Sequence, residues 1–446
     1  MKYLYSTLLL IIYISGFSQV STSAEDILQS LKIQNELIEN SIVKNLEFKN
    51  IGPSVMSGRV TDLEVNPNNP SEFYVAYASG GLWHTVNNGN TFTPIMDNSD
   101  TQNIGDFDID WSTRLIIVGT GENNSSRSSY AGVGILKSND NGKTWKNIGL
   151  NDSHHIGKIV INPNNPNEIV VAVLGHLYSK NKERGIFKTI DGGVTWENTL
   201  YIDESTGIID LDISPNNFKI QFASSWQKSR KAWDFKGNGE KSGIYKSVDS
   251  GKTWNLISTQ KSGFPTGNGV GRIGLAVFDS KTLYAVVDNQ FRRPKSKAST
   301  EKTDLSKNYF ESISKERFLK IDDLKLDKFL TTNSFPKKYN STKIKELVKN
   351  DLIKPSDLKL YLEDANTVMF ETPIIGAQVY RSDDGGLNWT LKNSYYLDRL
   401  YNTYGYYFGK IHVSPVNKDD IYIYGVPFIK SNDGGVTYKS IDYPNV

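Results

Sequence analysis

The chain has 446 residues, of which 38% are hydrophobic, and it contains no cysteine. This length and hydrophobic content allow a large buried core, while the lack of cysteine excludes a disulfide scaffold and a thiolate metal site. The 51 basic and 49 acidic residues leave a formal net charge of +2, so we expect no nucleic-acid partner and no global attraction to an anionic membrane.

Residues 1–18 are predicted to be a signal peptide. Lys2 supplies the positive start, Leu4 to Ile14 is an apolar run, and Gly16 to Ser18 offers small residues for cleavage. The apolar run is shorter than a transmembrane helix requires, and no later stretch is long enough. No cysteine follows for a lipid anchor. We therefore expect a mature chain that begins near Gln19, lacks a transmembrane segment, and is secreted, periplasmic or on the cell surface.

Residues 19–45 are predicted to form a helical lead-in. Within Ala24 to Val43, apolar residues recur at helical spacing. The next stretch, Leu46 to Gly52, resembles Thr144 to Gly149, which is the last strand of a later repeat. The propeller described next, residues 46–446, is thus expected to begin with an orphan outer strand.

A short turn motif recurs six times along the chain. In each copy a hydroxyl residue is followed two positions later by Asp or Asn, then by Gly two further, then by an aromatic residue three further. The central residues are Asn87, Asp140, Asp191, Asp249, Asp384 and Asp433. Their side chains can accept hydrogen bonds from the turn, and the Gly supplies a positive φ. We predict that these residues are structural.

The central residues are 53, 51, 58, 135 and 49 positions apart, a period near fifty with one interruption. In the third repeat, strands are predicted at Ile156 to Asn162, Glu168 to Leu174, Gly185 to Thr189 and Thr195 to Thr199. Four-stranded units with this period predict an all-β propeller. Six blades are visible. The orphan strand favours seven or more blades in the full protein, with this chain incomplete at its C-terminus; the alternative is a closed six-blade ring.

The long step is a predicted helical insertion, residues 292–372, between the second and third strands of blade five. It holds 18 of the 51 basic and 13 of the 49 acidic residues, so the basic excess lies here. Helices are expected at Lys343 to Asn350 and Asp357 to Asp364. We interpret the insertion as a cap whose charge forms a solvated face.

The long loops all fall on the face opposite the six turns, because antiparallel strands alternate direction. Binding residues concentrate on such loops. The binding candidates on this face or beside it are Arg59, Arg127, His155, Trp226, Arg230, Trp233, Arg272, Tyr404 and Tyr406. Glu122 is the main candidate acid, with Asp106 or Asp234 as its partner. Adjacent residues on an extended segment point to opposite sides, so His154 and His155 predict no metal site, and no cofactor is expected.

The six turns resemble the Asp-box, or BNR, repeat. The chain resembles secreted bacterial Asp-box propellers that are related to sortilin-type receptors and to xyloglucanases, among them long exported proteins labelled "glycosyl hydrolase". The matching stretches are Ile51 to Val60, Gly80 to Trp83, Val118 to Glu122, Gly271 to Gly274 and Tyr404 to Tyr407. The resemblance implies the propeller fold, the helical insertion and a longer protein.

The resemblance does not carry over the catalytic residues. A xyloglucanase would have an acid just before Gly80-Gly81, where this chain has Ala78-Ser79, and a second acid in a second propeller. A sialidase would use three Arg, and Arg59, Arg272 and Arg381 lie in or beside blade strands, but the Arg-Ile-Pro signature is absent.

Three functions are consistent with this pattern. The first, which we favour, is a sortilin-like module that binds a peptide, protein or glycan outside the cytoplasm. The second is a glycoside hydrolase of xyloglucanase-like or sialidase-like type that uses Glu122. The third is an extracytoplasmic assembly factor.

Overall fold

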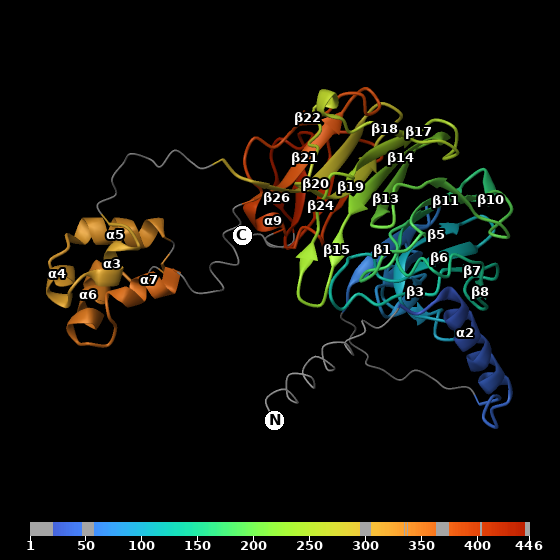
Figure 1. Cartoon of the computed structure of the whole chain (residues 1–446), viewed down its shortest axis with the longest axis horizontal. Helices are drawn as coiled ribbons and strands as arrows, with labels where there is room; N and C mark the ends of the chain where they lie inside the picture. Colours follow the sequence, from blue (N-terminus) through green and yellow to red (C-terminus); the bar gives the residue numbers. More distant parts are fainter. Residues whose placement is uncertain are drawn as a thin grey trace, which may run out of the picture.

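The computed structural model describes residues 21–46, 58–294, 305–333, 335–336, 338–362, 374–401 and 404–441. Six four-stranded sheets are arranged in sequence around a ring, as the chain colours in Figure 1 show. The signal peptide and nearly all of the expected orphan strand lie outside the described residues.

Each sheet is an antiparallel blade whose strands follow chain order. The strands of blades one to three are β1 Val60–Val65, β2 Phe73–Tyr77, β3 Gly81–Thr85, β4 Thr93–Pro94; β5 Ile104–Asp110, β6 Leu115–Thr120, β7 Ile135–Ser138, β8 Lys146–Asn147; β9 Ile156–Asn162, β10 Asn165–Val173, β11 Gly185–Thr189, β12 Glu197–Leu200. Those of blades four to six are β13 Thr206–Ser214, β14 Asn217–Gln227, β17 Gly243–Ser247, β18 Asn255–Leu256; β19 Val270–Val277, β20 Leu283–Arg292, β21 Ile374–Ser382, β22 Thr390–Leu391; β23 Lys410–Val413, β24 Ile421–Tyr424, β25 Phe428–Ser431, β26 Lys439–Ser440.

These six blades confirm the predicted all-β propeller. A further blade would lie beyond this chain and stays a prediction. The first strands of neighbouring blades contact one another from β1 through β5, β9, β13 and β19 to β23. The inner strands β5, β9, β13 and β19, which have a blade on each side, are therefore mostly buried, and every residue of β19 is buried. β1, which borders the seam, leaves Val60, Leu63 and Val65 exposed. The outermost strands of the blades are short, and five of the six are only two residues long.

The repeated turns have the hydrogen bonds that the sequence pattern predicts. At Asp140, Oδ1 accepts from Ser138 Oγ at 2.8 Å and from Thr144 N at 2.9 Å, and Oδ2 accepts from Thr144 Oγ1 at 2.6 Å. The Ser138 hydroxyl in turn accepts from Gly142 N at 2.8 Å, and Gly142 has a φ of 84°. The Asp140 side chain thus closes the turn, because these hydrogen bonds all come from residues of the same turn.

The aromatic residue that ends several of these turns also joins blades. Trp145 Nε1 donates to Ile95 O of the preceding blade at 2.9 Å, and Trp196 Nε1 donates to Ile148 O at 2.8 Å. A Trp ring buries apolar area while its N–H is satisfied, which suits it to this position. Each such residue packs its own outer strand against its neighbour.

One long loop of blade four contains a hairpin. The stretch from Trp226 to Ser242 is not irregular throughout: β14 continues to Gln227, and a two-stranded hairpin follows, formed by β15 Ser229–Arg230 and β16 Phe235–Lys236. The sequence misses it because each strand is two residues long, which is too short for a period-2 pattern.

The insertion in blade five folds around its own core. Its helices are α3 Tyr309–Ser312, α4 Lys315–Leu319, α5 Asp323–Thr332, α6 Ser341–Lys349 and α7 Ser356–Leu362. The two predicted helices correspond to α6 and α7. Buried side chains such as Phe310, Phe318 and Leu326 form a cluster within the insertion. The unit enters and leaves between β20 and β21, which remain paired as far as Arg292 and Ile374.

Two further α-helices lie outside the insertion among the described residues, together with a short 3-10 helix at Gln260–Ser262. Helix α2, Ala24–Glu39, begins at a capping box formed by Ser23 and Asp26 and buries none of its residues. Helix α9, Asp398–Tyr401, precedes blade six. None of the helices in the described ranges is both long and apolar enough to cross a membrane.

Candidate functional site

A cavity of about 700 Å³ lies between the first and the last blade. One wall is the start of β1, residues 58–63, and the other is residues 407–410 with His412, Tyr424 and Gly425. Asn124 and Arg272 contribute from blades two and five. Because these segments begin inner strands or end second strands, the cavity opens on the face of the long loops. We call it the seam cavity.

Arg59 and Glu122 form a bidentate ion pair at this cavity. Arg59 Nε and Nη2 donate to the two Glu122 carboxylate oxygens at 2.6 and 2.8 Å. The Glu122 side chain is fully buried, whereas that of Arg59 is 34% exposed. The hydrogen bonds to Glu122 outweigh the partial burial of the guanidinium and raise the pKa of Arg59. Glu122 therefore fixes a cation that faces the cavity.

The backbone around Glu122 is held from three sides. Gly121 has a φ of 85°, and a Cβ there would lie 1.8 Å from His154 O. Asn124 Nδ2 donates to Glu122 Oε1 at 3.2 Å, and His155 Nδ1 donates to Glu122 O at 2.8 Å. Burial lowers the pKa of His155 to about 3, so its ring is neutral. His155 is thus a support for Glu122 and is itself buried.

Arg272 lies deeper and has no carboxylate within ion-pair distance among the described residues. It is 3% exposed, and its Nη1 donates to Asn124 Oδ1, Tyr406 O and Tyr407 O at 3.3, 3.2 and 3.1 Å. Its buried Nε has no partner in the same ranges. Burial lowers the pKa of Arg272, although the charge of Asp210 opposes the change.

Several of the predicted binding residues pack near Arg272 and do not line the cavity. Trp226 is fully buried, donates from Nε1 to Gly237 O at 2.8 Å, and lies 5.9 Å from the Arg272 guanidinium. Arg230 lies 3.9 Å from the Phe235 ring and 5.3 Å from the Tyr406 ring. Complete burial prevents Trp226 from stacking on a ligand. The aromatic residues that line the cavity are instead Tyr407, Phe408 and Tyr424, which we did not predict.

The remaining candidates lie elsewhere. Arg127, Trp233 and Asp234 are exposed, and Trp233 and Asp234 occupy the tip of the β15–β16 hairpin. Tyr404 is 43% exposed and lies 6.1 Å from the Tyr406 ring. None of these residues lines the seam cavity.

Asp106 does not meet Glu122. It lies on β5, where Oδ1 accepts from Lys158 Nζ at 3.0 Å and Oδ2 accepts from Ile159 N at 2.8 Å. Lys158 also donates to Asp62 at 2.8 Å. Burial, together with the charge of Asp62, raises the pKa of Asp106. These residues join three blades near the ring centre, so Asp106 serves the scaffold.

Further carboxylates on the inner strands were missed. Asp108 Oδ2 accepts from Ile161 N at 2.7 Å, and two blades later Asp210 and Asp212 accept from Leu275 N and Val277 N at 2.9 and 2.7 Å. Each acid thus binds the backbone of the next blade. The available signal was Asp at alternate positions in strands that are otherwise apolar.

A family model described as sortilin-Vps10 (sortilin, neurotensin receptor 3) matches residues 134–369, which is 236 of the 446 residues. No curated protein matches the sequence.

Three solved structures are similar over most of this chain. An ancestral GH74 enzyme is 14% identical with a TM-score of 0.49, and the alignment covers 86% of this chain and 38% of that one. The GH74 xyloglucanase from Xanthomonas campestris is 12% identical with a TM-score of 0.47, covering 84% and 45%. YCF48 bound to D1 peptide is 11% identical with a TM-score of 0.42, covering 86% and 82%. The chain spans less than half the length of the two GH74 proteins.

Proposed function

Because the chain belongs to the sortilin-Vps10 family, we propose that it is a binding propeller whose seam cavity receives an anionic group of a peptide, protein or glycan. The family description names a receptor. We extend ligand binding to this chain, with the seam cavity as the site and an anionic group as the part of the ligand that is bound.

Arg272 carries this proposal. A buried guanidinium is stable only when its charge and its donors are matched, and carboxylates are its usual partners. Here the partners within the described residues are one amide oxygen and two carbonyl oxygens, and Nε has none. A carboxylate, sulfate or phosphate entering the cavity would supply the missing charge.

Arg59 supports the same chemistry from the opposite wall. Its partner Glu122 is buried, so the exposed part of the guanidinium is oriented but not covered. Tyr407 lines the same cavity. Burial raises the pKa of its hydroxyl, and the charges of Arg59 and Arg272 oppose that rise. The two cations and the aromatic wall suit an acidic group attached to an apolar or ring-shaped body.

A hydrolase is less well supported by this geometry. A glycosidase needs two carboxyl groups on opposite sides of one bond. Glu122 is buried and occupied by Arg59, and Asp62 is the only acid among the described residues that line the cavity. Burial alone would raise the pKa of Asp62, but the charges of Lys158 and Lys410 outweigh it and lower the pKa. Asp62 is therefore unsuited to act as a general acid.

The site of action follows from the N-terminal sequence. Lys2 and the apolar run from Leu4 to Ile14 have the pattern of an export signal. We infer that the ligand is met outside the cytoplasm, in the periplasm, at the cell surface or in the medium.

The test is calorimetry with matched acidic and neutral probes. Short peptides with a free or an amidated C-terminus, and oligogalacturonates against neutral xyloglucan fragments, are titrated into the chain. We expect saturable binding of at least one acidic probe and at least about tenfold weaker binding of its neutral counterpart. Equal affinity for both members of every pair would contradict the proposal.

Variants distinguish binding in the seam cavity from attraction to positive charge elsewhere on the surface. Arg272→Gln is expected to abolish binding, Arg272→Lys to retain part of it, and Arg127→Gln, which removes an exposed cation on the same face, to leave it unchanged. Thermal unfolding verifies that each variant is folded. Release of sugar from a glycan, lost on Glu122→Gln, would overturn the binding function in favour of the hydrolase.

A further inference from the structure

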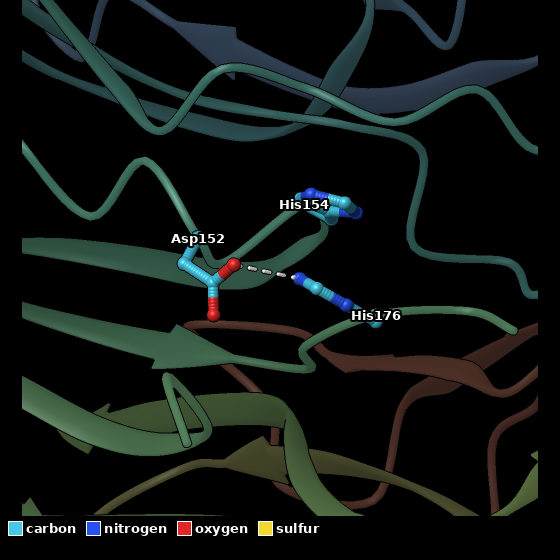
Figure 2. Close-up of side chains that lie close together, drawn as sticks. All are labelled: Asp152, His154 and His176. Atoms are coloured by element: carbon cyan, nitrogen blue, oxygen red, sulfur yellow. Dashed lines mark hydrogen bonds and ion pairs between the residues drawn. The ribbon is translucent and has the colours of Figure 1, made fainter. Parts of the chain in front are cut away.

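A second cluster of ligand-type side chains lies away from the seam cavity, in blade three. Asp152 and His154 come from the segment between β8 and β9, and His176 comes from the segment between β10 and β11. One ligand atom from each of the three residues lies within 4.8 Å of the other two. Figure 2 shows the two imidazole rings and the carboxylate gathered at one point.

The local backbone separates the two adjacent histidines. His154 has a φ of 56°, which is uncommon for a residue other than Gly. As a result His155 reaches Glu122 O, while the His154 ring stacks on His176 with centroids 3.6 Å apart. His154 and His155 therefore have different neighbours, and His154 meets Asp152 and His176, which lie 2 and 22 positions away in the sequence.

One buried polar atom in the cluster and another beside it lack hydrogen-bond partners. His154 Nε2 is buried without a hydrogen-bond partner in the described part of the chain, and so is Glu183 Oε2. Leaving a buried acceptor unmatched is unfavourable, so both atoms are available to a cation or its water.

His176 is held in a way that suits a ligand. Its Nδ1 lies 2.7 Å from Ser179 Oγ and its Nε2 lies 3.1 Å from Asp152 Oδ1. Without an ion, Nε2–H donates to Asp152 and the Ser179 hydroxyl donates to Nδ1. If the proton moves to Nδ1 and the hydroxyl turns, Ser179 becomes the acceptor and Nε2 is free to coordinate. A second partner of this kind fixes the tautomer of metal-binding histidines.

The charges around the cluster allow an ion. A neighbouring cation, Arg184, donates to Leu174 O, His176 O and Ser179 O. Asp152 and Glu183 balance that charge. The Asp152 side chain is 31% exposed, which leaves a route for the ion.

We propose that Asp152, His154 and His176 bind a divalent transition-metal ion, with zinc as the reference ion. Two imidazoles and one carboxylate favour zinc, copper or nickel over magnesium and calcium, which prefer all-oxygen sites. Water completes the coordination. The stacked rings must rotate so that their lone pairs converge on the ion, and the bound ion then joins two loops on the face that carries the seam cavity.

The experiment is calorimetry with zinc chloride on the untagged chain after chelation, alongside nickel, magnesium and calcium chlorides. Zinc is expected to bind with a stoichiometry of one, and magnesium and calcium are expected not to bind. His154→Ala and His176→Ala should weaken zinc binding by at least about tenfold. His84→Ala, which removes a histidine on β3 outside both proposed sites, should leave it unchanged.

A cobalt spectrum provides a readout that a merely structural role would not change. Cobalt added to the chelated chain should give a visible absorption of an imidazole-bound ion that is absent from both cluster variants. If His154→Ala is unfolded by circular dichroism, Asp152→Asn, which alters a partly exposed side chain, decides the question. Absence of stoichiometric zinc binding to the unaltered chain, or equal binding to all variants, would overturn the site.

Discussion

At the scale of single residues, the propeller contains buried ionisable side chains, and Asp288 is one of them. Asp288 on β20 is 3% exposed and lies against the backbone of residue 405, where a Cβ on Gly405 would be 2.0 Å from the Asp288 Cγ. Gln290 Nε2 donates to its Oδ2 at 2.6 Å. Burial outweighs this bond and raises the pKa of Asp288 to about 6, above the ordinary 3.8.

Asp288→Asn is expected to stabilise the protein in a pH-dependent way. The folded wild type holds its proton more tightly than the unfolded chain, so Asp288 becomes destabilising as pH rises from about 4 to 6 and stays so above. The difference between about 6 and 3.8 corresponds to a gain of at most roughly 3 kcal/mol for the Asn variant at pH 8. Urea unfolding of both proteins at pH 4, 6 and 8 measures it.

At pH 4 the two proteins should have nearly the same stability. A difference that does not change with pH would mean that ionisation of Asp288 is not its cause.

The Asp-box turn is the repeated element of the fold, and its buried hydroxyl is its central atom. Ser138 Oγ donates to Asp140 and accepts from Gly142 N, and Ser138 is 1% exposed. The same pair of bonds occurs at Thr85, Thr189, Ser247, Ser382 and Ser431. The turn is therefore a closed network and offers no free ligand atoms at this hydroxyl.

Ser138→Ala should lower the free energy of unfolding by about 1–2 kcal/mol, because it leaves the Gly142 N–H without an acceptor. Chemical denaturation with an unchanged m-value measures the loss. Ser128→Ala, at an exposed position on the opposite face, is the matched control and should change stability by less than about 0.5 kcal/mol. Equal effects of the two variants would contradict this role of the turn.

The helical insertion has a hydrophobic core of its own. Its apolar residues pack on one another, and β20 and β21 pair without it from Leu283 and Ser382 to Asn289 and Gly376. Replacing residues 295–373 by a short Gly/Ser linker should leave the propeller folded.

Calorimetry checks this independence. We expect two thermal transitions in the full chain and one in the deletion variant, with the propeller transition shifted by only a few degrees. Failure of the deletion variant to fold, shown by loss of its β-type circular dichroism, would mean that the insertion is part of the propeller core.

At the scale of the whole molecule, charged residues join the blades around the ring centre. Lys158 of blade three donates to Asp62 of blade one and Asp106 of blade two, and the amine of Lys410 in blade six donates to Thr61 O of blade one. Lys410 Nζ also lies 3.8 Å from Asp62. The inner ends of four blades are thus connected by two lysines, although the seam between the first and last blades stays open as a cavity.

Lys158→Met should be strongly destabilising, by about 3–5 kcal/mol, because it leaves the buried Asp106 without its cation and leaves Asp62 only the more distant Lys410. Adding Asp106→Asn to Lys158→Met should restore part of the loss by removing one of these charges. Denaturant unfolding of the two single variants and the double variant gives the coupling energy. Additive losses would contradict the shared network.

The prediction of the fold succeeded where the signal is local. The third repeat shows this best, since its first and third strands were predicted at Ile156 to Asn162 and Gly185 to Thr189, the observed bounds of β9 and β11. Alternation, Asn-Pro turns and the Asp-box are all contained in a few neighbouring residues. The hairpin at Ser229 and the helices α3 and α4 were missed because short elements depend on packing more than on their own pattern. Helix α5 has ten residues, and the available signal was its N-cap Asp322, whose side chain accepts from Lys325 N.

The sequence by itself determined the blades and their turns, because a β-meander is built from contacts between neighbours in the chain. Only the tertiary structure decided which side chains meet. Arg59 reaches Glu122 across 63 positions, Arg272 reaches Asn124 across 148, and His154 meets His176 instead of His155. The physical reason is ring closure: the propeller gathers the starts of six distant strands around one centre, and no local pattern records which of them face each other.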